Sequence, residues 1–269
     1  MNRDLLSADS HFDFGRNWAD YSVRISDAEI EEAKKALLRL VSEQELKGAS
    51  FLDIGSGSGL HSLAAHMLGV GEITAIDIDP DSVSTTRKTL DRFGVSARVE
   101  RKSIFEEHDI GQFDIVYSWG VLHHTGDMWT AVRRAASYVK PGGLFVIALY
   151  QKTPLCGAWV IEKRFYTAAP QVLRKVASGV FGAALLSAGV LRGRNPVTYV
   201  KKYRSARGMS FWHDIHDWLG GFPYESSTPQ ETATFVTGLG FEPVVIGDLK
   251  PRLGLFGTGC AEYVFRREK

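Results

Sequence analysis

The stretch FLDIGSGSGLHSLAA, residues 51–65, constrains the fold of this chain more than any other feature. A short apolar run leads into three alternating glycines, Gly55, Gly57 and Gly59, and a helix-compatible segment follows. Glycine is favoured where a chain turns tightly or where its backbone must approach a ligand closely. A strand, a glycine turn and a helix in this order predict the first unit of an α/β sheet, with a ligand-binding loop at the end of the strand.

The alternation of short apolar runs with helical stretches continues along the chain and predicts a doubly wound parallel sheet with helices on both faces. The expected strands lie at 50–55, 72–78, 97–102, 113–118 and 144–150, and the expected helices at 59–69, 80–93 and 127–139. Ser26 and Glu29 have the spacing of a capping box, which predicts that an earlier helix begins there. Pro141, Gly142 and Gly143 predict a turn before the fifth strand.

The alternation stops after Tyr150 and resumes at Thr228. A helix to about Leu239 is then expected, followed by two strands that pair antiparallel at the sheet edge, near 243–248 and at 260–266. The chain therefore divides into four regions. They are an N-terminal segment and helix covering the cofactor site (1–47), a core (48–150), a helical insertion that covers the acceptor (151–227) and the C-terminal part of the core sheet (228–269).

Composition excludes several classes of protein. The chain has 269 residues, 44% of them hydrophobic and 23% charged, and a formal net charge of +1, so the molecule as a whole is not an obvious polyanion binder. Its two cysteines argue against a disulfide scaffold and fit a reducing compartment. The first residues lack the apolar core of a signal peptide, and no uncharged apolar run reaches the length of a spanning helix. These features predict a cytoplasmic protein without a transmembrane segment.

Three ligands compete for the glycine loop. A P-loop needs Lys followed by Ser or Thr after its last glycine, but Leu60 and His61 follow Gly59. The dinucleotide fingerprint needs a third glycine where Leu60 stands. S-adenosylmethionine carries no phosphate. Its ammonium suits a carboxylate such as Asp53, and its ribose hydroxyls suit Asp77 at the end of the next expected strand.

These residues, together with FDIVYSWGVLHHTGD (113–127) and VKPGGLFVIALY (139–150), resemble the class I S-adenosylmethionine-dependent methyltransferases. The likeness is closest to the ubiquinone-biosynthesis-like group of small-molecule methylases, and it covers about residues 48–150 well and 228–267 more loosely. It implies a Rossmann-like seven-stranded sheet of order 3-2-1-4-5-7-6 with strand 7 antiparallel.

The resemblance also implies cofactor-binding positions, grouped by the part of the cofactor that they would contact. Ser103 departs from the family, which often has an aspartate there, so the adenine contact is the least secure. The positions are Asp53, Gly55, Ser56 and Gly57 for the methionine end, Asp77 for the ribose, Ile78, Ser103 and Ile104 for the adenine, and Ser118, Trp119 and Gly120 beside the sulfonium. Core packing remains an equal alternative for Trp119.

His123 and His124 follow the fourth expected strand, next to where the methyl group should point. Methyl transfer to oxygen requires removal of a proton, and histidine titrates in a range that suits a base. The alternative is that one histidine caps the following helix and the other packs. Both are candidate catalytic residues.

The stretch FWHDIHDWLGGFPYE, residues 211–225, is rich in aromatic residues. His213 and His216 are three apart, as are Asp214 and Asp217, so each pair would share a face of a helix. Three interpretations stay open: a metal site, an acceptor site with His213, His216 or Asp217 as the base, and a solvated amphipathic turn. The aromatic density favours the acceptor site, and we expect no resident metal.

The N-terminal FDFGRNWADYS contains aromatic residues that could fold over the cofactor as a lid, Trp18 among them. Packing on the outside of a helix is an equal alternative.

Residues 163–213 contain ten Lys or Arg and no Asp or Glu, and they enclose the sixteen uncharged residues 176–191. A lid for an anionic acceptor, a membrane-surface contact reaching a lipid-linked acceptor, an RNA-binding surface and a buried helix or homodimer contact all fit this pattern. We favour a lid or dimer contact, because sixteen residues are short for spanning and the three glycines among them weaken a free amphipathic helix. Nucleic acid is disfavoured, because few aromatic residues are mixed with the basic ones.

The sequence therefore predicts an S-adenosylmethionine-dependent methyltransferase that O-methylates a small or carrier-linked metabolite, such as a sugar, a glycan precursor or a secondary metabolite. The alternatives are an RNA or protein methyltransferase that docks through the basic insertion, and a protein that binds the cofactor without catalysis.

Overall fold

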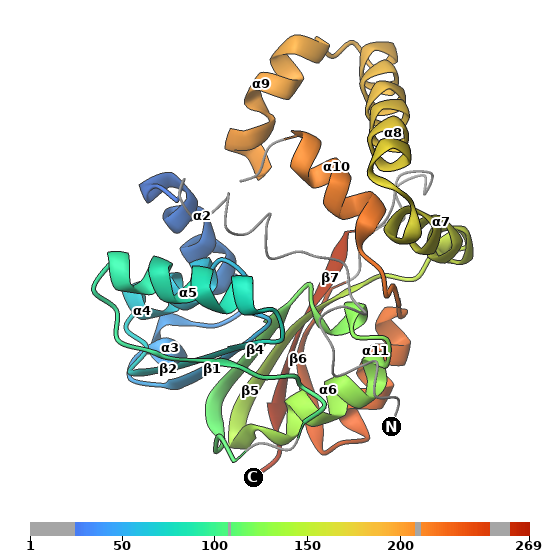
Figure 1. The fold of residues 1–269 in the computed structure, drawn as a ribbon. Coiled ribbons are helices and arrows are strands. Elements are labelled where there is room, and N and C mark those ends of the chain that lie inside the picture. The colour runs from blue at the N-terminus through green and yellow to red at the C-terminus, as the bar shows by residue number, and fades with distance from the viewer. Residues whose placement is uncertain (1–24, 107–108, 208–210, 248–258) are drawn as a thin grey trace.

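The computed structural model describes residues 25–106, 109–207, 211–247 and 259–269, and its centre is a seven-stranded sheet (Figure 1). The strand order is β3-β2-β1-β4-β5-β7-β6, with β7 antiparallel to both β5 and β6. This confirms the predicted order and the antiparallel pair. The strands are β1 (Ser50–Ile54), β2 (Glu72–Asp77), β3 (Arg98–Arg101), β4 (Phe113–Trp119), β5 (Val139–Tyr150), β6 (Phe241–Ile246) and β7 (Cys260–Arg267).

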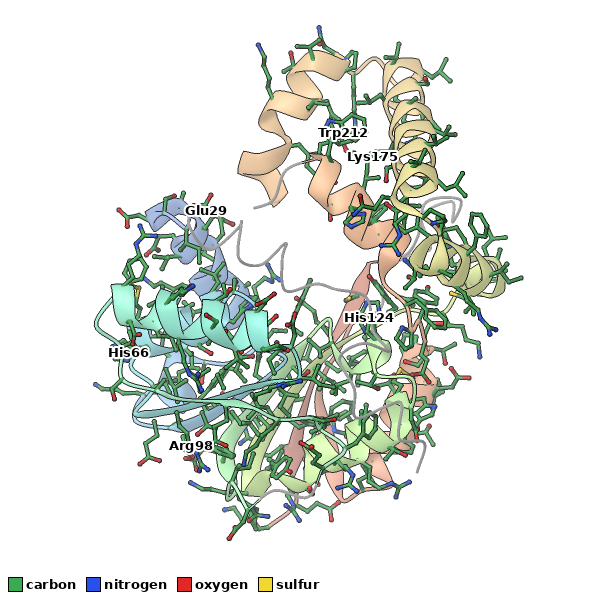
Figure 2. All side chains as sticks on the ribbon, viewed as in Figure 1. Glu29, His66, Arg98, His124, Lys175 and Trp212 are labelled. Atoms are coloured by element: carbon green, nitrogen blue, oxygen red, sulfur yellow. The ribbon has the colours of Figure 1, made fainter. Side chains whose placement is uncertain are left out.

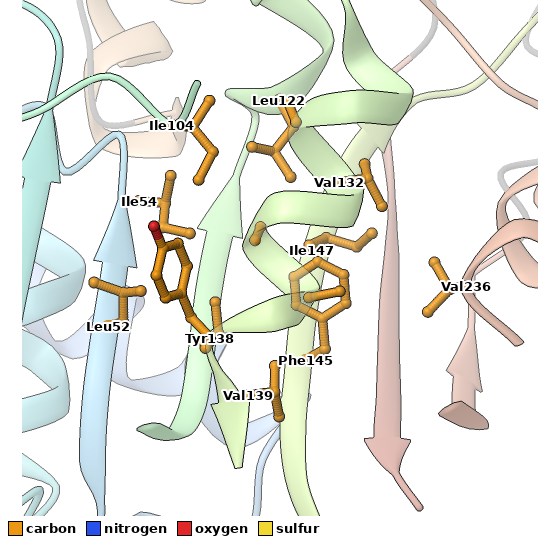
Figure 3. Close-up of a cluster of buried hydrophobic side chains, with 14 of the residues drawn as sticks. Leu52, Ile54, Ile104, Leu122, Val132, Tyr138, Val139, Phe145, Ile147 and Val236 are labelled. Atoms are coloured by element: carbon orange, nitrogen blue, oxygen red, sulfur yellow. The ribbon is translucent and has the colours of Figure 1, made fainter. Parts of the chain in front are cut away.

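Helices cover both faces of the sheet, as the alternation of apolar runs predicts. One face carries the buried side chains of α6 (Met128–Ser137) and α11 (Pro229–Thr237), and Figure 3 shows part of this cluster. The other face is covered by three longer helices and by the single turn α3 (Glu43–Leu46). The three are α2 (Asp27–Leu38), α4 (Leu60–Met67) and α5 (Pro80–Arg92).

The helix of the N-terminal region begins as predicted, with a capping box between Ser26 and Glu29. Its apolar stripe of Ile30, Ala33 and Leu37 is buried in the same cluster as β1 and α4. This helix is therefore a layer of the core. The aromatic segment with Trp18 lies outside the described residues.

One predicted boundary is wrong. Pro141, Gly142 and Gly143 do not form a turn before the fifth strand but lie inside β5, which begins at Val139. The pairing with β4 shifts register between Phe113 and Ile115. A side chain at Gly143 would place its Cβ 2.8 Å from the Asp114 carbonyl oxygen, so the close approach of two strands explains a glycine here.

The insertion consists of helices that stand beyond the C-terminal ends of the parallel strands (Figure 1). They are α7 (Cys156–Ala168), α8 (Gln171–Leu191), α9 (Pro196–Arg207) and α10 (Phe211–Gly220). They share a separate apolar cluster that includes Tyr166, Phe211 and Ile215. The chain then returns to the core along the end of β5, where Gln151 pairs with Ser227.

Candidate functional site

The glycine loop connects β1 to α4 at the point where the order of strands reverses. β1 lies between β2 and β4, and open α/β sheets bind ligands outside the carboxyl ends of strands at such a point. Gly55, Gly57 and Gly59 have φ values of 75°, 53° and 75°, which side chains other than glycine rarely adopt. The Gly55 amide donates to the Ile76 carbonyl at 2.8 Å and so ties the loop to β2.

The loop is also fixed from the α5 side. The hydroxyl oxygens of Ser56 and Thr86 lie 3.0 Å apart, and the Thr86 hydroxyl donates to the Gly57 carbonyl at 3.1 Å. A Cβ at Gly59 would lie 3.1 Å from the Thr86 Cα. The loop is therefore held in shape by its neighbours.

Two carboxyl groups lie at the ends of the strands that flank this loop. Asp53 is buried and accepts a hydrogen bond of 2.6 Å from the Ser62 hydroxyl. Asp77 accepts from the amides of Gly57 and Asp79, both at 3.0 Å. Burial raises the pKa of Asp53 to about 7, and burial also raises that of Asp77 to about 6. Burial removes the water that stabilises the charged carboxylates. A cationic ligand bound here would stabilise the charged forms in place of that water.

The segment after β4 lies directly over the glycine loop. A Cβ built on Gly55 would come within 2.5 Å of both methyl carbons of Val121. Gly120, with φ of 76°, makes the turn that brings Val121 there. The Ser118 hydroxyl is fully buried and donates to the Ile54 carbonyl at 3.0 Å, so it joins β4 to β1.

Trp119 is not packed in the core, which was the alternative expected from the sequence. Its side chain is 43% exposed, and its indole N–H donates to Glu262 of β7 at 3.0 Å. The ring also stacks against His61 of α4, with centroids 6.4 Å apart. The indole therefore lies across the ends of β4 and β7 and is open to a ligand or a covering segment.

The positions expected beside adenine lie at the ends of β2 and β3. Ile78 is partly exposed, whereas Ser103 and Ile104 are buried. The Ser103 hydroxyl accepts from the Phe105 amide at 3.3 Å, and the Ser103 amide donates to Glu106 at 3.1 Å. This serine therefore shapes its own turn, and Ile78 is the more accessible apolar contact.

His123 is fully buried on the one-turn helix η3 (Leu122–His124). The Tyr150 amide donates to its Nδ1 at 3.3 Å, and burial lowers the pKa of the imidazole well below its ordinary value. A neutral ring that accepts at Nδ1 must carry its proton on Nε2. Within the described residues this Nε2 has no hydrogen-bond partner. The geometry thus makes His123 a donor and does not support its expected role as a base.

His124 has the opposite tautomer. Its Nδ1 lies 2.7 Å from the Pro223 carbonyl oxygen. A carbonyl can only accept, so Nδ1 carries the proton and the lone pair of the neutral ring is on Nε2. Figure 2 places His124 where the core meets the insertion. Of the two histidines, His124 has the electronic arrangement of a base.

The returning segment of the insertion holds η3 in place. The Glu225 amide donates to the His123 carbonyl at 2.9 Å, and the Glu225 carboxylate accepts from the Met128 amide at 2.9 Å, at the start of α6. Burial raises the pKa of Glu225 to about 7. The histidines, the end of β5 and the return of the insertion therefore form one connected structure.

Polar groups of α7 lie beside this structure, and the sequence did not single them out. The buried Lys163 donates to the Trp218 carbonyl, and its ammonium lies 5.4 Å from the centre of the Tyr224 ring. Burial raises the pKa of the neighbouring Glu162 to about 7. The Cys156 sulfur lies 3.4 Å from the Tyr224 hydroxyl. One signal in the sequence was available: Glu162 and Lys163 are the first charged residues after a nine-residue uncharged run.

The polar residues of α10 have a different setting. The His216 Nδ1 lies 2.7 Å from the Tyr166 hydroxyl, and the buried Asp214 accepts from Tyr203. Tyr166 and Tyr203 belong to the apolar cluster of the insertion, so these bonds connect its helices. His213 and Asp217 lie on the same helix, and their side chains are outside what the structure describes. The structure thus brings His123 and His124 to the strand ends, and it places the α10 residues within the insertion.

In the parts of the chain that the structure describes, no group of three or more His, Cys, Asp or Glu is arranged to hold a metal ion. The two cysteines, Cys156 and Cys260, are free thiols.

Comparison with known proteins agrees with this geometry. A family model described as a methyltransferase domain matches residues 52–145. A ubiquinone biosynthesis O-methyltransferase from Xanthomonas euvesicatoria is 34% identical over 126 residues, which are 46% of this chain and 52% of that protein. The chain thus matches about half the length of such curated relatives.

Solved structures are similar in fold. Magnesium protoporphyrin IX methyltransferase from Synechocystis PCC 6803, with bound S-adenosylhomocysteine, aligns with a TM-score of 0.54 at 14% identity, over 90% of this chain and 84% of that one. An O-methyltransferase family protein from Burkholderia thailandensis aligns with a TM-score of 0.54 at 14% identity, over 93% of this chain and 58% of that one. At this identity the likeness concerns the fold alone.

The matched residues contain the glycine loop, both carboxylates and the segment after β4 that lies over the loop. The sheet order, the family match and the relatives agree on one class. Residues 52–145 therefore match a methyltransferase domain, and the sheet order and the relatives are consistent with this match.

Proposed function

We propose that this protein transfers the methyl group of S-adenosylmethionine to an oxygen atom of a small or carrier-linked metabolite. The observation that carries the proposal is a pair of carboxyl groups, the buried Asp53 and the partly buried Asp77, on either side of a glycine loop at the reversal of strand order. The relatives that act on oxygen support the choice of atom. Sugars, glycan precursors and secondary metabolites remain candidate acceptors.

The residues present fit the cofactor. Asp53 and the loop around Ser56 would hold the methionine end, where its ammonium offsets the burial of a carboxylate. Asp77 would accept the ribose hydroxyls, and Ile78 would contact the adenine. Trp119 and Gly120, at the end of β4, would border the sulfonium. When bound, the cofactor would supply a methyl group on its sulfonium, to which an oxygen nucleophile can bond as S-adenosylhomocysteine leaves.

His124 is the residue that we propose as the general base. Its Nδ1–H donates to the Pro223 carbonyl, which orients the ring and leaves the lone pair on Nε2. A base fixed in one orientation removes the proton of a hydroxyl as the new carbon–oxygen bond forms. His123 lies against it, with ring centroids 4.4 Å apart, and its neutral state avoids a second positive charge beside the base.

The first experiment asks which molecules accept the methyl group. The protein would be incubated with methyl-labelled S-adenosylmethionine and a cell extract, which is then separated into soluble-metabolite, lipid and macromolecular fractions. We expect the label in the metabolite or lipid fraction. Label found only in RNA or protein would contradict the proposal and favour a macromolecular acceptor.

The second experiment tests the base with the labelled fraction as substrate. His124→Ala should lower kcat by about 100-fold or more, the range for loss of a general base, and should leave the affinity for S-adenosylmethionine unchanged. His66→Ala is the matched control, because His66 is an exposed histidine on α4, well separated from His124 (Figure 2). A His124→Ala variant that keeps the wild-type kcat would remove His124 from the chemistry.

A further inference from the structure

The helix α8 is apolar on two sides, and only one of them is covered. Its inner side chains, including Phe181 and Leu185, pack against the apolar cluster of the insertion. Its outer side chains are exposed, among them Val172 at 72%, Val180 at 66% and Leu191 at 89%. A helix that is apolar all round is normally buried, so the uncovered side requires an explanation.

The exposed residues form a continuous stripe rather than scattered positions. Val172, Val176, Val180 and Ala184 follow one another at intervals of four, which places them on one side of the helix. In Figure 2 the side chains of α8 project from the helix on the side turned away from α9 and α10. We call Val172, Val176, Val180, Ala183, Ala184, Val190 and Leu191 the outer stripe of α8.

The preceding helix also exposes apolar side chains. Ile161 is 73% exposed and Phe165 is 64% exposed, and they lie one turn apart on α7. Only Ala169 and Pro170 separate α7 from α8. Exposed apolar side chains thus extend over two consecutive helices.

Basic residues frame the outer stripe. Lys175 lies near the start of α8, and Arg192 and Arg194 follow its end. The neighbouring Arg174 instead donates to the Ala169 and Thr167 carbonyls. No acidic residue occurs between positions 163 and 213. The surface therefore combines a strip of apolar side chains with uncompensated positive charge at both ends.

We propose that α8 lies in the surface of an anionic phospholipid membrane, with its outer stripe among the acyl chains and its flanking basic residues at the lipid phosphates. Helices that bind membrane surfaces combine an apolar face with basic residues whose long side chains reach the headgroups. Anionic headgroups supply the negative charge that residues 163–213 lack. This inference does not depend on the identity of the methyl acceptor.

A helix that crosses the membrane fits the structure less well. By length and composition alone, Gln171–Leu191 could span a bilayer, and in the described residues it is the one helix that could. Its inner side, however, packs against Phe211 and Ile215 of the insertion. A helix that spans the bilayer would lose these contacts with Phe211 and Ile215, whereas a helix that lies in the membrane surface would keep them.

A second copy of the chain is also a poorer occupant. If two α8 helices packed along their outer stripes, Lys175 would meet either its own copy or Arg192 and Arg194. Either arrangement brings like charges together, and no acidic residue in this segment offsets them. On this argument a membrane surface is a better occupant than the dimer contact that the sequence also predicted.

The test uses the full chain and the flotation of vesicles made of phosphatidylcholine alone or of phosphatidylcholine mixed with phosphatidylglycerol. We expect the protein to float with the mixed vesicles, to float less with neutral ones and to be released by high salt. Val176→Glu combined with Val180→Glu should lower the vesicle-bound fraction by about tenfold or more, because each glutamate removes an apolar contact and adds a repelled charge.

Two further variants separate the contributions. Lys175→Gln with Arg192→Gln should reduce the preference for anionic over neutral vesicles. Val244→Glu is the matched control, since Val244 is 54% exposed but lies on β6 of the core sheet, and it should bind vesicles like the wild type. Circular dichroism should show unchanged helix content in every variant that is compared.

Three results would overturn the proposal. The first is failure of the wild type to float with either kind of vesicle. The second is binding that the two glutamates leave intact. The third is the absence of vesicle binding together with evidence for another partner. That evidence would be a dimer, seen in light scattering, that the two glutamates dissociate, or RNA binding that only the Lys175 and Arg192 changes abolish.

Discussion

At the scale of single residues, the site is dominated by two carboxyl groups in an unfavourable environment. Burial raises the pKa of Asp53 to about 7 and that of Asp77 to about 6. Near neutral pH the charged forms of both carboxyls are therefore less favourable than they would be in water. Above these values the negative charge is present and attracts a cation. Below them the carboxyls bind protons, and the attraction is lost.

A first prediction follows for S-adenosylmethionine. Its affinity for the wild type should rise with pH and level off at about pH 8, where both groups are ionised. Asp77→Asn should weaken binding by about 1–3 kcal/mol at that pH, the cost of a lost charged hydrogen bond, and should make the pH dependence shallower. Titration calorimetry across this range measures both quantities.

The comparison is made against Asp91→Asn, because Asp91 is an exposed carboxylate on α5. The ammonium of the ligand titrates equally in every variant, so the difference between curves isolates the protein. If Asp77→Asn and the wild type gave the same affinity and the same slope, Asp77 would not belong to the cofactor site.

At the scale of elements, the periodicity of the sequence was sufficient to predict the strands of the sheet. Each predicted strand of the core is present, because buried strands read as short apolar runs and surface helices carry a polar face. The end of β5 was predicted, but its start was not. Pro141 and two glycines normally mark a turn, and here they lie at the register shift between the Phe113–Val139 and Ile115–Leu144 pairs, where Gly142 has a φ of 78°.

Contacts between distant segments could not be predicted. The tautomer of His124 depends on Pro223, which is 99 residues further along the chain. That of His123 depends on the Tyr150 amide. The sequence therefore indicated both histidines but could not tell which ring carries its proton on Nδ1 and which on Nε2. The uncharged run 176–191 was equally ambiguous, since periodicity does not reveal which apolar side is covered.

A second prediction concerns the packing of the turn after β4 on the glycine loop. Gly55→Ala should destabilise the protein by about 2–5 kcal/mol, which combines the strain of a positive φ with the overlap of the new Cβ on Val121. Thermal and chemical unfolding measure the loss.

Gly94→Ala separates the two causes, because Gly94 has a φ of 69° and open space around it. This control should show the strain alone, about 1–2 kcal/mol. Val121→Ala in the Gly55→Ala background should recover part of the difference. Equal losses at Gly55 and Gly94 would mean that the two segments do not press on each other.

At the scale of the whole molecule, the chain has apolar clusters on both faces of the sheet and a third one in the insertion. The return segment joins the insertion to the core through backbone pairs such as Gln151 with Ser227 and Glu225 with His123. Regions with separate clusters and few shared contacts open with different free energies. The insertion is thus suited to move without disturbing the glycine loop.

A third prediction tests this independence. Ile215→Ala empties a buried position in the insertion and should cost about 2–5 kcal/mol locally. Hydrogen exchange should speed up in α7, α8 and α10, while the amides of β1 and β4 keep their protection. Ile147→Ala, a change of the same type at a buried position of β5, should instead accelerate exchange in the sheet. A uniform loss of protection in Ile215→Ala would show that the insertion and the core unfold as one unit.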